Sequence, residues 1–390
     1  MKLADRVAQL KPSATLSVSA KAQELKAKGK NILSLSVGEP DFPTPARICK
    51  AAKEAINSGF TRYTPVPGIP ELRAAAAAYF NRNYGISADA DHIIVSNGGK
   101  HSLYNVCQAL LNPGDHVLIP APYWVSYPPM VELAAAKPVI IATTPEKDFK
   151  VTPADLEKSL TPKTRLLLLN SPSNPTGTSY GQEELDAIAR WAVEHDVIVI
   201  ADEIYDRLVY GGLEPLSMCS WWQKHPENFV VVNGTSKTFA MTGWRVGYTL
   251  AHADLIRAMS RLQGQSTSNV CSVSQKAALA ALSGDMEEVE EMRIAFERRR
   301  DLAMDIVSSW RDVVCPTPSG AFYIFPDVHK HYGERFADST SLCTTLLSEA
   351  GVALVPGAAF GDDRCIRISY AVSDEVLISA LHMVAKILLR

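Results

Sequence analysis

The strongest constraint on the fold is an alternation of short apolar runs with amphipathic stretches between residues 92 and 263. Six apolar runs predict strands, at residues 92–96, 116–120, 164–170, 196–202, 229–234 and 245–251. Three amphipathic stretches predict helices, at residues 100–111, 182–195 and 254–263. Because runs of Val, Ile and Leu without polar alternation are typical of strands covered on both faces, we predict an α/β domain with a mostly parallel sheet between helices.

A second, smaller α+β domain is predicted from the two ends of the chain. A long charged helix is expected over residues 285–310, with Arg298, Arg299 and Arg300 on its solvated side. Further strands are predicted at residues 320–325, 351–355 and 364–370, and a closing helix at residues 374–389. The segment 1–47 is too short to hold a core of its own, so we expect it to pack with the C-terminal part. The predicted domains are 48–283, and 1–47 together with 284–390.

Composition excludes several classes of function. The chain has 390 residues and a formal net charge of −3, which provides no basic face for nucleic acid. Its longest apolar runs are strand-sized and too short to span a bilayer, so we expect a cytoplasmic protein without membrane contacts. The seven cysteines and nine histidines are dispersed without metal-ligand spacing, so we predict reduced thiols and no metal site.

Two loops rich in glycine or proline follow predicted strands. Gly98, Gly99 and Lys100 open a helix, whose free N–H groups favour an anion, although a Gly-Gly turn before a helix is often only a turn. The sequence S-P-S-N-P-T-G at 171–177 holds Asn174 at the carboxyl end of a strand, where ligands of open α/β sheets bind. A rigid strand-to-helix connection explains the same residues, so neither loop alone predicts a site.

Charged side chains also follow buried strands. Asp202 ends an apolar strand, and its carboxylate needs a partner, either a strand-end cap or a cationic ligand nitrogen. Lys237 lies among small residues after residues 229–234, a setting that can lower the pKa of a lysine and make it a nucleophile or Schiff-base former. A single lysine is still most often structural. Arg245 supplies a permanently charged donor suited to phosphate.

Arg367 lies between two isoleucines in a predicted strand, so its side chain points to the opposite face from theirs. In a cleft it would clamp a carboxylate, and in solvent it would be ordinary. A nucleotide-binding oxidoreductase would require a glycine-rich fingerprint, and a metal enzyme would require clustered His and Cys, both of which the sequence lacks. The clusters are persuasive only in combination.

In their order along the chain, these clusters resemble the class I aminotransferases, which are pyridoxal-5′-phosphate (PLP) enzymes of fold type I. The resemblance extends from Lys11-Pro12-Ser13-Ala14-Thr15 to Arg367-Ile368-Ser369-Tyr370 and is closest to the bacterial aspartate and aspartate–prephenate aminotransferase branch. It rests on S-P-S-N-P-T-G, D-E-I-Y at 202–205 and S-K-x-x-x-M-T-G-W-R at 236–245. It implies a PLP-binding domain at 48–283 and a small domain with a mobile N-terminal segment.

The resemblance also implies catalytic roles. Lys237 would form the internal aldimine with PLP and then move the substrate proton. Asp202 would pair with the pyridine nitrogen, and Tyr205 and Asn174 would hydrogen-bond the 3′-oxygen of the ring. The residues implied to bind the cofactor are Gly98, Gly99, Lys100, Trp124, Asn174, Asp202, Tyr205, Lys237 and Arg245, with Tyr63 reaching the phosphate in a partner subunit. The last assignment implies a homodimer with active sites at the subunit interface.

For the substrate, the resemblance implies that Arg367 holds the α-carboxylate. The residues implied to bind substrate are Thr15, Gly38, Lys100, Trp124, Asn174 and Arg367. Among these, Thr15 and Lys100 would read a distal carboxylate, which favours a dicarboxylic amino acid. Many relatives have a phosphate-binding serine three residues before the lysine. Here that position is Gly234, so phosphate binding would depend on Thr235 or on water.

The expected activity is PLP-dependent transfer of an amino group between aspartate, or another dicarboxylic amino acid, and 2-oxoglutarate by a ping-pong aldimine/ketimine mechanism, with prephenate as a further substrate. The alternatives on the same fold are an alanine, aromatic or kynurenine aminotransferase and a carbon–sulfur lyase. A lyase would release pyruvate and ammonia without converting the cofactor to its amine form. A non-catalytic binding protein is disfavoured because Lys237 is intact and no DNA-binding segment is added.

Overall fold

The computed structural model describes residues 1, 3–8, 10, 12 and 14–389, so Lys11 and Ser13 lie outside the described residues. A seven-stranded sheet has the order β2-β8-β7-β6-β5-β3-β4. Its strands are β2 (Ile93–Ser96), β3 (His116–Ala121), β4 (Lys137–Ala142), β5 (Thr164–Asn170), β6 (Ile198–Asp202), β7 (Phe229–Gly234) and β8 (Gly247–Leu250). Only β8 pairs antiparallel with its neighbours in this sheet, among the described residues. The predicted mostly parallel sheet is confirmed.

Strand β4 is the part of this sheet that the sequence did not predict. It lies at the edge of the sheet and pairs only with β3 among the described strands. Lys137 is exposed and Ile140 keeps 43% of its surface in solvent. The sequence of β4, K-P-V-I-I-A, contains the apolar run 139–142, but Pro138 argues against a strand in the interior of a sheet and is tolerated at an edge.

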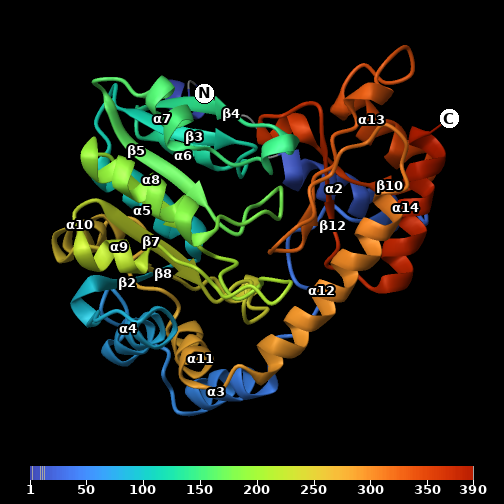
Figure 1. Cartoon of the computed structure of the whole chain (residues 1–390). Helices are drawn as coiled ribbons and strands as arrows, with labels where there is room; N and C mark the ends of the chain where they lie inside the picture. The colour runs from blue at the N-terminus through green and yellow to red at the C-terminus, as the bar shows by residue number, and fades with distance from the viewer. Residues whose placement is uncertain (2, 9, 11, 13, 390) are drawn as a thin grey trace.

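Helices cover both faces of the sheet, as the left half of Figure 1 shows. Alternate residues of one strand supply the two cores: Leu166 and Leu168 face one group of helices, and Leu167 and Leu169 face the other. The first group is α5 (Gly99–Leu110), α6 (Tyr127–Leu133) and α10 (Ala253–Gly264). The second is α3 (Ala46–Asn57), α4 (Pro70–Tyr84), α7 (Pro153–Ser159), α8 (Gln182–Glu194), α9 (Cys219–Lys224) and α11 (Ser272–Ser283). Full burial of each leucine contributes about 1.5–3 kcal/mol, which explains the unbroken apolar run.

The two ends of the chain meet on the other side of the molecule. β1 (Leu33–Ser34) pairs in parallel with β10 (Val352–Ala353). A three-stranded antiparallel sheet has the order β11-β12-β9, with β9 (Tyr323–Ile324), β11 (Val355–Pro356) and β12 (Ile366–Ser369). The helices here are α2 (Ala14–Ala27), α12 (Glu287–Val307), α13 (Ser339–Thr345) and α14 (Asp374–Leu388). In Figure 1 the blue α2 lies among the orange and red C-terminal elements.

Helix α12 corrects one prediction, that Arg298, Arg299 and Arg300 all face solvent. Arg298 is exposed, but Arg299 is 7% exposed and donates to both oxygens of Asp41, with N–O distances of 2.7 and 3.0 Å. Arg300 is half-buried, and its guanidinium carbon lies 5.2 Å from the ring centroid of Tyr210. Successive residues of an α-helix are rotated by about 100°, so three in a row cannot share one face.

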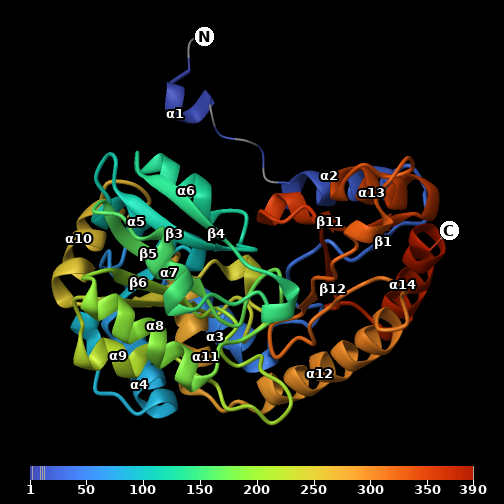
Figure 2. The same cartoon turned by 45° about the horizontal axis from the view of Figure 1, so that its top comes forward.

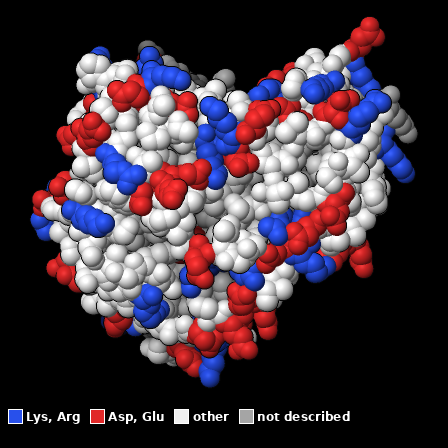
Figure 3. Space-filling model, in the orientation of Figure 1, with Lys and Arg blue, Asp and Glu red and all other residues white. Residues whose placement is uncertain are grey.

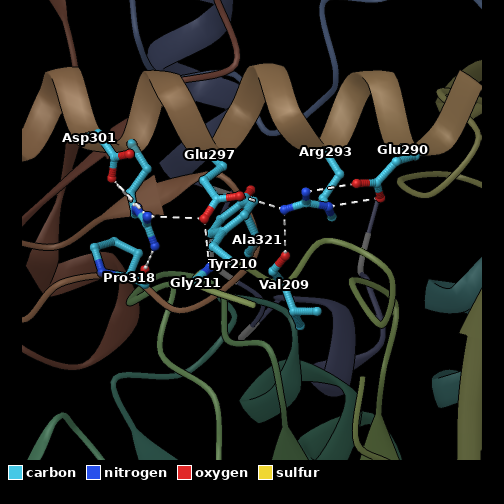
Figure 4. A network of polar contacts seen from close by, with 10 residues as sticks. Val209, Tyr210, Gly211, Glu290, Arg293, Glu297, Asp301, Pro318 and Ala321 are labelled. Carbon is cyan, nitrogen blue, oxygen red and sulfur yellow. Dashed lines mark hydrogen bonds and ion pairs between the residues drawn. The ribbon is translucent and has the colours of Figure 1, made fainter. Parts of the chain in front are cut away.

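A network of polar contacts joins α12 to the turn at 209–211, which follows β6 (Figure 4). Arg293 lies between Glu290 and Glu297, with N–O distances of 2.8 and 2.6 Å, and donates to the carbonyl of Val209. Glu297 also accepts a hydrogen bond from the backbone N–H of Gly211 at 2.6 Å. The network therefore fixes the helix of the C-terminal part to the part that contains the large sheet.

The short helix α1 (Asp5–Ala8) extends away from the rest of the chain in Figure 2. Figure 3 shows acidic and basic side chains interspersed over one face, with a hollow between the two parts at the top of the view. None of the described helices is both long enough and apolar enough to cross a membrane.

Candidate active site

A cavity of about 250 Å³ lies at the carboxyl ends of β5 and β6 and beside the loop that follows β7. It brings together all but two of the predicted site residues. Those that line it are Thr15, Gly38, Gly99, Lys100, Trp124, Asn174, Asp202, Tyr205, Lys237, Arg245 and Arg367. The carboxyl ends of parallel strands meet at one edge of a sheet, which is why residues so distant in sequence converge here.

Asp202 ends β6 and is 5% exposed. Its Oδ2 accepts a hydrogen bond from the phenol of Tyr127 at 2.7 Å, and its Oδ1 accepts one from the N–H of Ile204 at 3.3 Å. Burial raises the pKa of Asp202 to about 6, although both hydrogen bonds and the charge of Lys237 oppose the rise. The carboxylate is therefore ionised at neutral pH, but its burial makes the charged form less stable, and a cationic partner would offset this loss.

Lys237 follows β7 and is half-buried. Its Nζ donates to the backbone carbonyl of Gly38 at 2.6 Å. Burial lowers the pKa of Lys237 from 10.5 to about 8, with Glu39 opposing the shift and Arg245 adding to it. A lysine with such a pKa has a substantial neutral fraction near pH 7–8 and can act as a nucleophile or a base.

One end of the cavity suits an anion. Gly98, with φ of 86°, precedes α5, so the first N–H groups of this helix point out of its N-terminus. The exposed Arg245 lies against them, and a Cβ at Gly98 would overlap its guanidinium. Ser236 lines the cavity, whereas the buried Thr235 does not and points its hydroxyl toward the carbonyl of Val246 at 3.4 Å. Of Thr235 and Ser236, only Ser236 therefore has its side chain placed to reach an anion in the cavity.

Arg367 also lines the cavity and is 2% exposed. It donates to the side-chain oxygen of Asn174 at 3.0 Å and to the carbonyl of Ser36 at 2.6 Å. Its guanidinium carbon lies 4.7 Å from the ring centroid of Tyr323 and 4.9 Å from that of Phe360. Its Nε has no hydrogen-bond partner, and no carboxylate of the described residues lies within ion-pair distance. A buried, uncompensated guanidinium favours a ligand with a negative charge.

Lys100, Trp124 and Thr15 form the remaining wall. The Nζ of Lys100 lies 4.9 Å from the ring centroid of Trp124, and the Trp124 ring meets Tyr127 edge-on at 5.5 Å. Thr15 belongs to α2 and reaches the cavity from the N-terminal segment. Lys100 therefore adds a further cation to a cavity that Lys237, Arg245 and Arg367 also line.

Two predicted residues do not line the cavity. Gly98 lies directly before Gly99, which does line it. Tyr63 lies in the loop before α4, with 91% of its surface exposed, and does not line this cavity. Its predicted role concerns the site of a partner subunit, so it stays a prediction.

Several contributors were missed from the sequence. Tyr127 orients Asp202, and the phenol of Tyr323 lies 2.9 Å from that of Tyr205. Asn170 lines the cavity and accepts from the N–H of Asn174 at 2.8 Å. A Cβ at Gly38 would come within 2.7 Å of the Tyr323 hydroxyl, so the glycine permits a close approach. A tyrosine among apolar residues is typical of a core, so the sequence did not indicate a role for either tyrosine. Only Asn170 could have been found, because it lies at the carboxyl end of a predicted strand.

The large sheet and this cavity define an aminotransferase: residues 30–384 match the family model "Aminotransferase class I and II", and the chain belongs to that family. Among its relatives, the aspartate/prephenate aminotransferase of Cereibacter sphaeroides is 46% identical over 96% of both chains. The aspartate aminotransferase of Bacillus subtilis is 43% identical over 99% of this chain and 98% of its own. The aspartate aminotransferase of Thermus thermophilus, solved with maleate, superposes with a TM-score of 0.94 at 43% identity, covering 99% of this chain and 100% of its own.

Proposed function

We propose that this chain is an aspartate aminotransferase, which moves an amino group between aspartate, or another dicarboxylic amino acid, and 2-oxoglutarate with PLP bound at Lys237. The observation that carries the proposal is the convergence of Lys237, Asp202 and Arg367 on one cavity. These residues supply a nucleophilic amine, a buried carboxylate and a buried guanidinium. The names of the relatives agree with this substrate class.

The residues around the cavity fit PLP. Asp202 is a buried carboxylate with neutral donors only, which suits a protonated ring nitrogen. The α5 N-terminus, Ser236 and Arg245 suit the phosphate. Trp124 provides a flat apolar face for the ring, and Lys237 supplies the amine. When bound, PLP supplies an electron sink for the charge left on the substrate Cα after proton removal.

The chain's own residues would then have four roles. Arg367, supported by Asn174, would bind the substrate α-carboxylate and orient the Cα–H bond. Lys237, once its amine is released, would take the proton from Cα and return it to the C4′ atom, on the other side of the substrate nitrogen. Tyr205 and Asn174 would hold the 3′-oxygen of the ring. Closure of residues 38–42 over the cavity would exclude water from these steps.

A distal carboxylate would be read by Lys100 and Thr15, which lie on the rim of the same cavity. The Thermus thermophilus enzyme was solved with maleate, itself a dicarboxylate. One relative's name includes prephenate, which carries two carboxylates, so we include prephenate as an additional substrate.

The test is a donor–acceptor matrix of aspartate, glutamate, alanine and phenylalanine against 2-oxoglutarate, oxaloacetate and prephenate. We expect the highest kcat/KM for aspartate with 2-oxoglutarate. A preference for alanine or phenylalanine would contradict the assignment. Release of pyruvate and ammonia without formation of the amine form of the cofactor would instead identify a carbon–sulfur lyase.

We further propose a homodimer in which Tyr63 of each subunit reaches the partner's phosphate site. Its exposed position in a single chain supports this proposal. Residues 48–283 would form the PLP-binding domain, and residues 1–47 with 284–390 the small domain. Sedimentation analysis of wild type and Tyr63→Phe would test the dimer. A monomer with full activity would contradict it, and the cytoplasmic location stays a prediction.

A further inference from the structure

Residues 36–44, here called the strap, run past the cavity, which Gly38 lines. The carbonyl of Ser36 accepts from Arg367 at 2.6 Å, and the carbonyl of Gly38 accepts from Lys237 at 2.6 Å. The hydroxyl of Thr44 donates to a carbonyl in the loop after Lys237 at 2.7 Å. The strap therefore touches both the amine and the guanidinium of the proposed site through its backbone.

Asp41 fixes the strap to α12. Both of its oxygens accept from Arg299, whose side chain is 9% exposed, against 31% for Asp41. The Arg299 guanidinium carbon lies 5.3 Å from the ring centroid of Phe42 and 5.7 Å from that of Phe296. The two rings meet edge-on at 5.5 Å. The two parallel charge-assisted hydrogen bonds to Asp41, together with the two rings near the guanidinium, give the ion pair one well-defined geometry.

Contacts on two sides hold Arg299 and its helix in place. Earlier on the same helix, Arg293 and Glu297 bind the 209–211 turn that follows β6 (Figure 4). On the other side, Asp374 at the start of α14 lies 3.5 Å from Arg299 Nε. Helix α12 therefore links Asp41 to the part of the chain that contains Asp202.

We propose that Arg299 and Asp41 are a positioning pair: their ion pair holds the strap where the Gly38 and Ser36 carbonyls meet Lys237 and Arg367. Neither residue lines the cavity, so the pair acts on the substrate only through the strap. The inference rests on the proposed function for its kinetic consequences. Its structural half concerns the protein alone.

The variants are Asp41→Asn, which keeps the shape of the side chain but loses its charge, and Arg299→Lys, which keeps the charge but loses the fork. The matched control is Arg298→Lys, because Arg298 is the exposed neighbour on the same helix and pairs with Asp374 instead of the strap. Asp41→Glu tests rescue by a longer carboxylate. Hydrogen exchange of residues 36–44 is measured by mass spectrometry, without and with PLP, and kcat and KM for aspartate are measured alongside.

We expect exchange in the strap to become about tenfold faster in Asp41→Asn and Arg299→Lys, and KM for aspartate to rise about tenfold with a smaller change in kcat. Arg298→Lys should behave as wild type, and Asp41→Glu should recover part of the loss. Unchanged exchange in both variants would overturn the proposal. So would a lower melting temperature with unchanged KM, which marks a purely structural pair. A wild-type protein without transaminase activity would overturn the proposed function, while the exchange result still decides whether the pair holds the strap.

Discussion

The phenol of Tyr127 donates to Oδ2 of Asp202 at 2.7 Å, across 75 positions of sequence. The second hydrogen bond to this carboxylate comes from the N–H of Ile204. Both donors are neutral, and no cation of the described residues lies within ion-pair distance of the carboxylate. Asp202 is consequently oriented by the protein, while its charge is left for a cation that arrives with a ligand.

This relationship predicts the pH dependence of PLP binding to the cofactor-free protein. The pKa of Asp202 is about 6, so affinity should fall as the pH drops through 6 and the carboxylate is neutralised. Because the Tyr127 hydrogen bond lowers this pKa, Tyr127→Phe should move the midpoint to higher pH. Fluorescence titration of PLP at a series of pH values measures the shift. The control is Tyr84→Phe, which removes a phenol bound to Asp206 outside the cavity and should leave the midpoint in place.

The amine of Lys237 should react at lower pH than an ordinary lysine. Its pKa is about 8 because of burial, so its rate of reductive methylation in cofactor-free protein should rise as the pH passes through 8 and the amine loses its proton. Peptide mass spectrometry follows the rate. The Lys237→Ala variant should still bind PLP but lose its covalent attachment and its turnover. A midpoint near 10.5, or near-wild-type turnover of Lys237→Ala, would refute the assigned role.

Lys100→Ala should weaken dicarboxylic substrates selectively. A hydrogen bond to a charged group contributes about 1.5–3 kcal/mol, so kcat/KM for aspartate and glutamate should fall at least about tenfold, with a smaller change for alanine. Lys224→Ala is the control, since Lys224 also lies over an indole ring, at 5.4 Å from Trp221, but outside the cavity. Equal losses for all three amino acids would contradict the assigned role of Lys100.

Gly234→Ser should destabilise the protein. A Cβ at this position would lie 2.9 Å from Ile204 Cδ1, 3.0 Å from the Val246 carbonyl and 3.1 Å from the Gly247 Cα. Two of these atoms are backbone and cannot rotate away, so we expect a loss of about 1–3 kcal/mol in unfolding free energy. Gly243→Ser, where no atom lies within 4 Å, should be neutral. Urea unfolding of both variants makes the comparison.

The charged residues of the site could be predicted from sequence because each one follows or occupies a buried strand. Asp202 and Lys237 come after runs that can only be interior strands, and parallel strands end at the same edge. The family resemblance then assigned their roles. The strand order, with the antiparallel β8 between β2 and β7, left no such local signal, because it depends on pairing between distant segments.

The residues that hold the charged groups in place were largely hidden. Tyr127 and Tyr323 are interior tyrosines, and nothing local distinguishes a phenol that binds Asp202 or Tyr205 from one that fills space. Arg299 was assigned to solvent because charged residues usually are. Its partner Asp41 lies 258 positions away, so only the folded chain reveals the pair.

The pairing of β1 with β10 has a consequence for biosynthesis. Leu33 and Ser34 precede the strap, yet the residues opposite them in the sheet, Val352 and Ala353, lie more than 300 positions later in the sequence. On the ribosome, the large sheet has all its strands long before β10 emerges. Nascent chains halted before residue 352 should therefore hold a folded sheet with an unseated strap, and catalytic competence should arrive only after β10 has emerged.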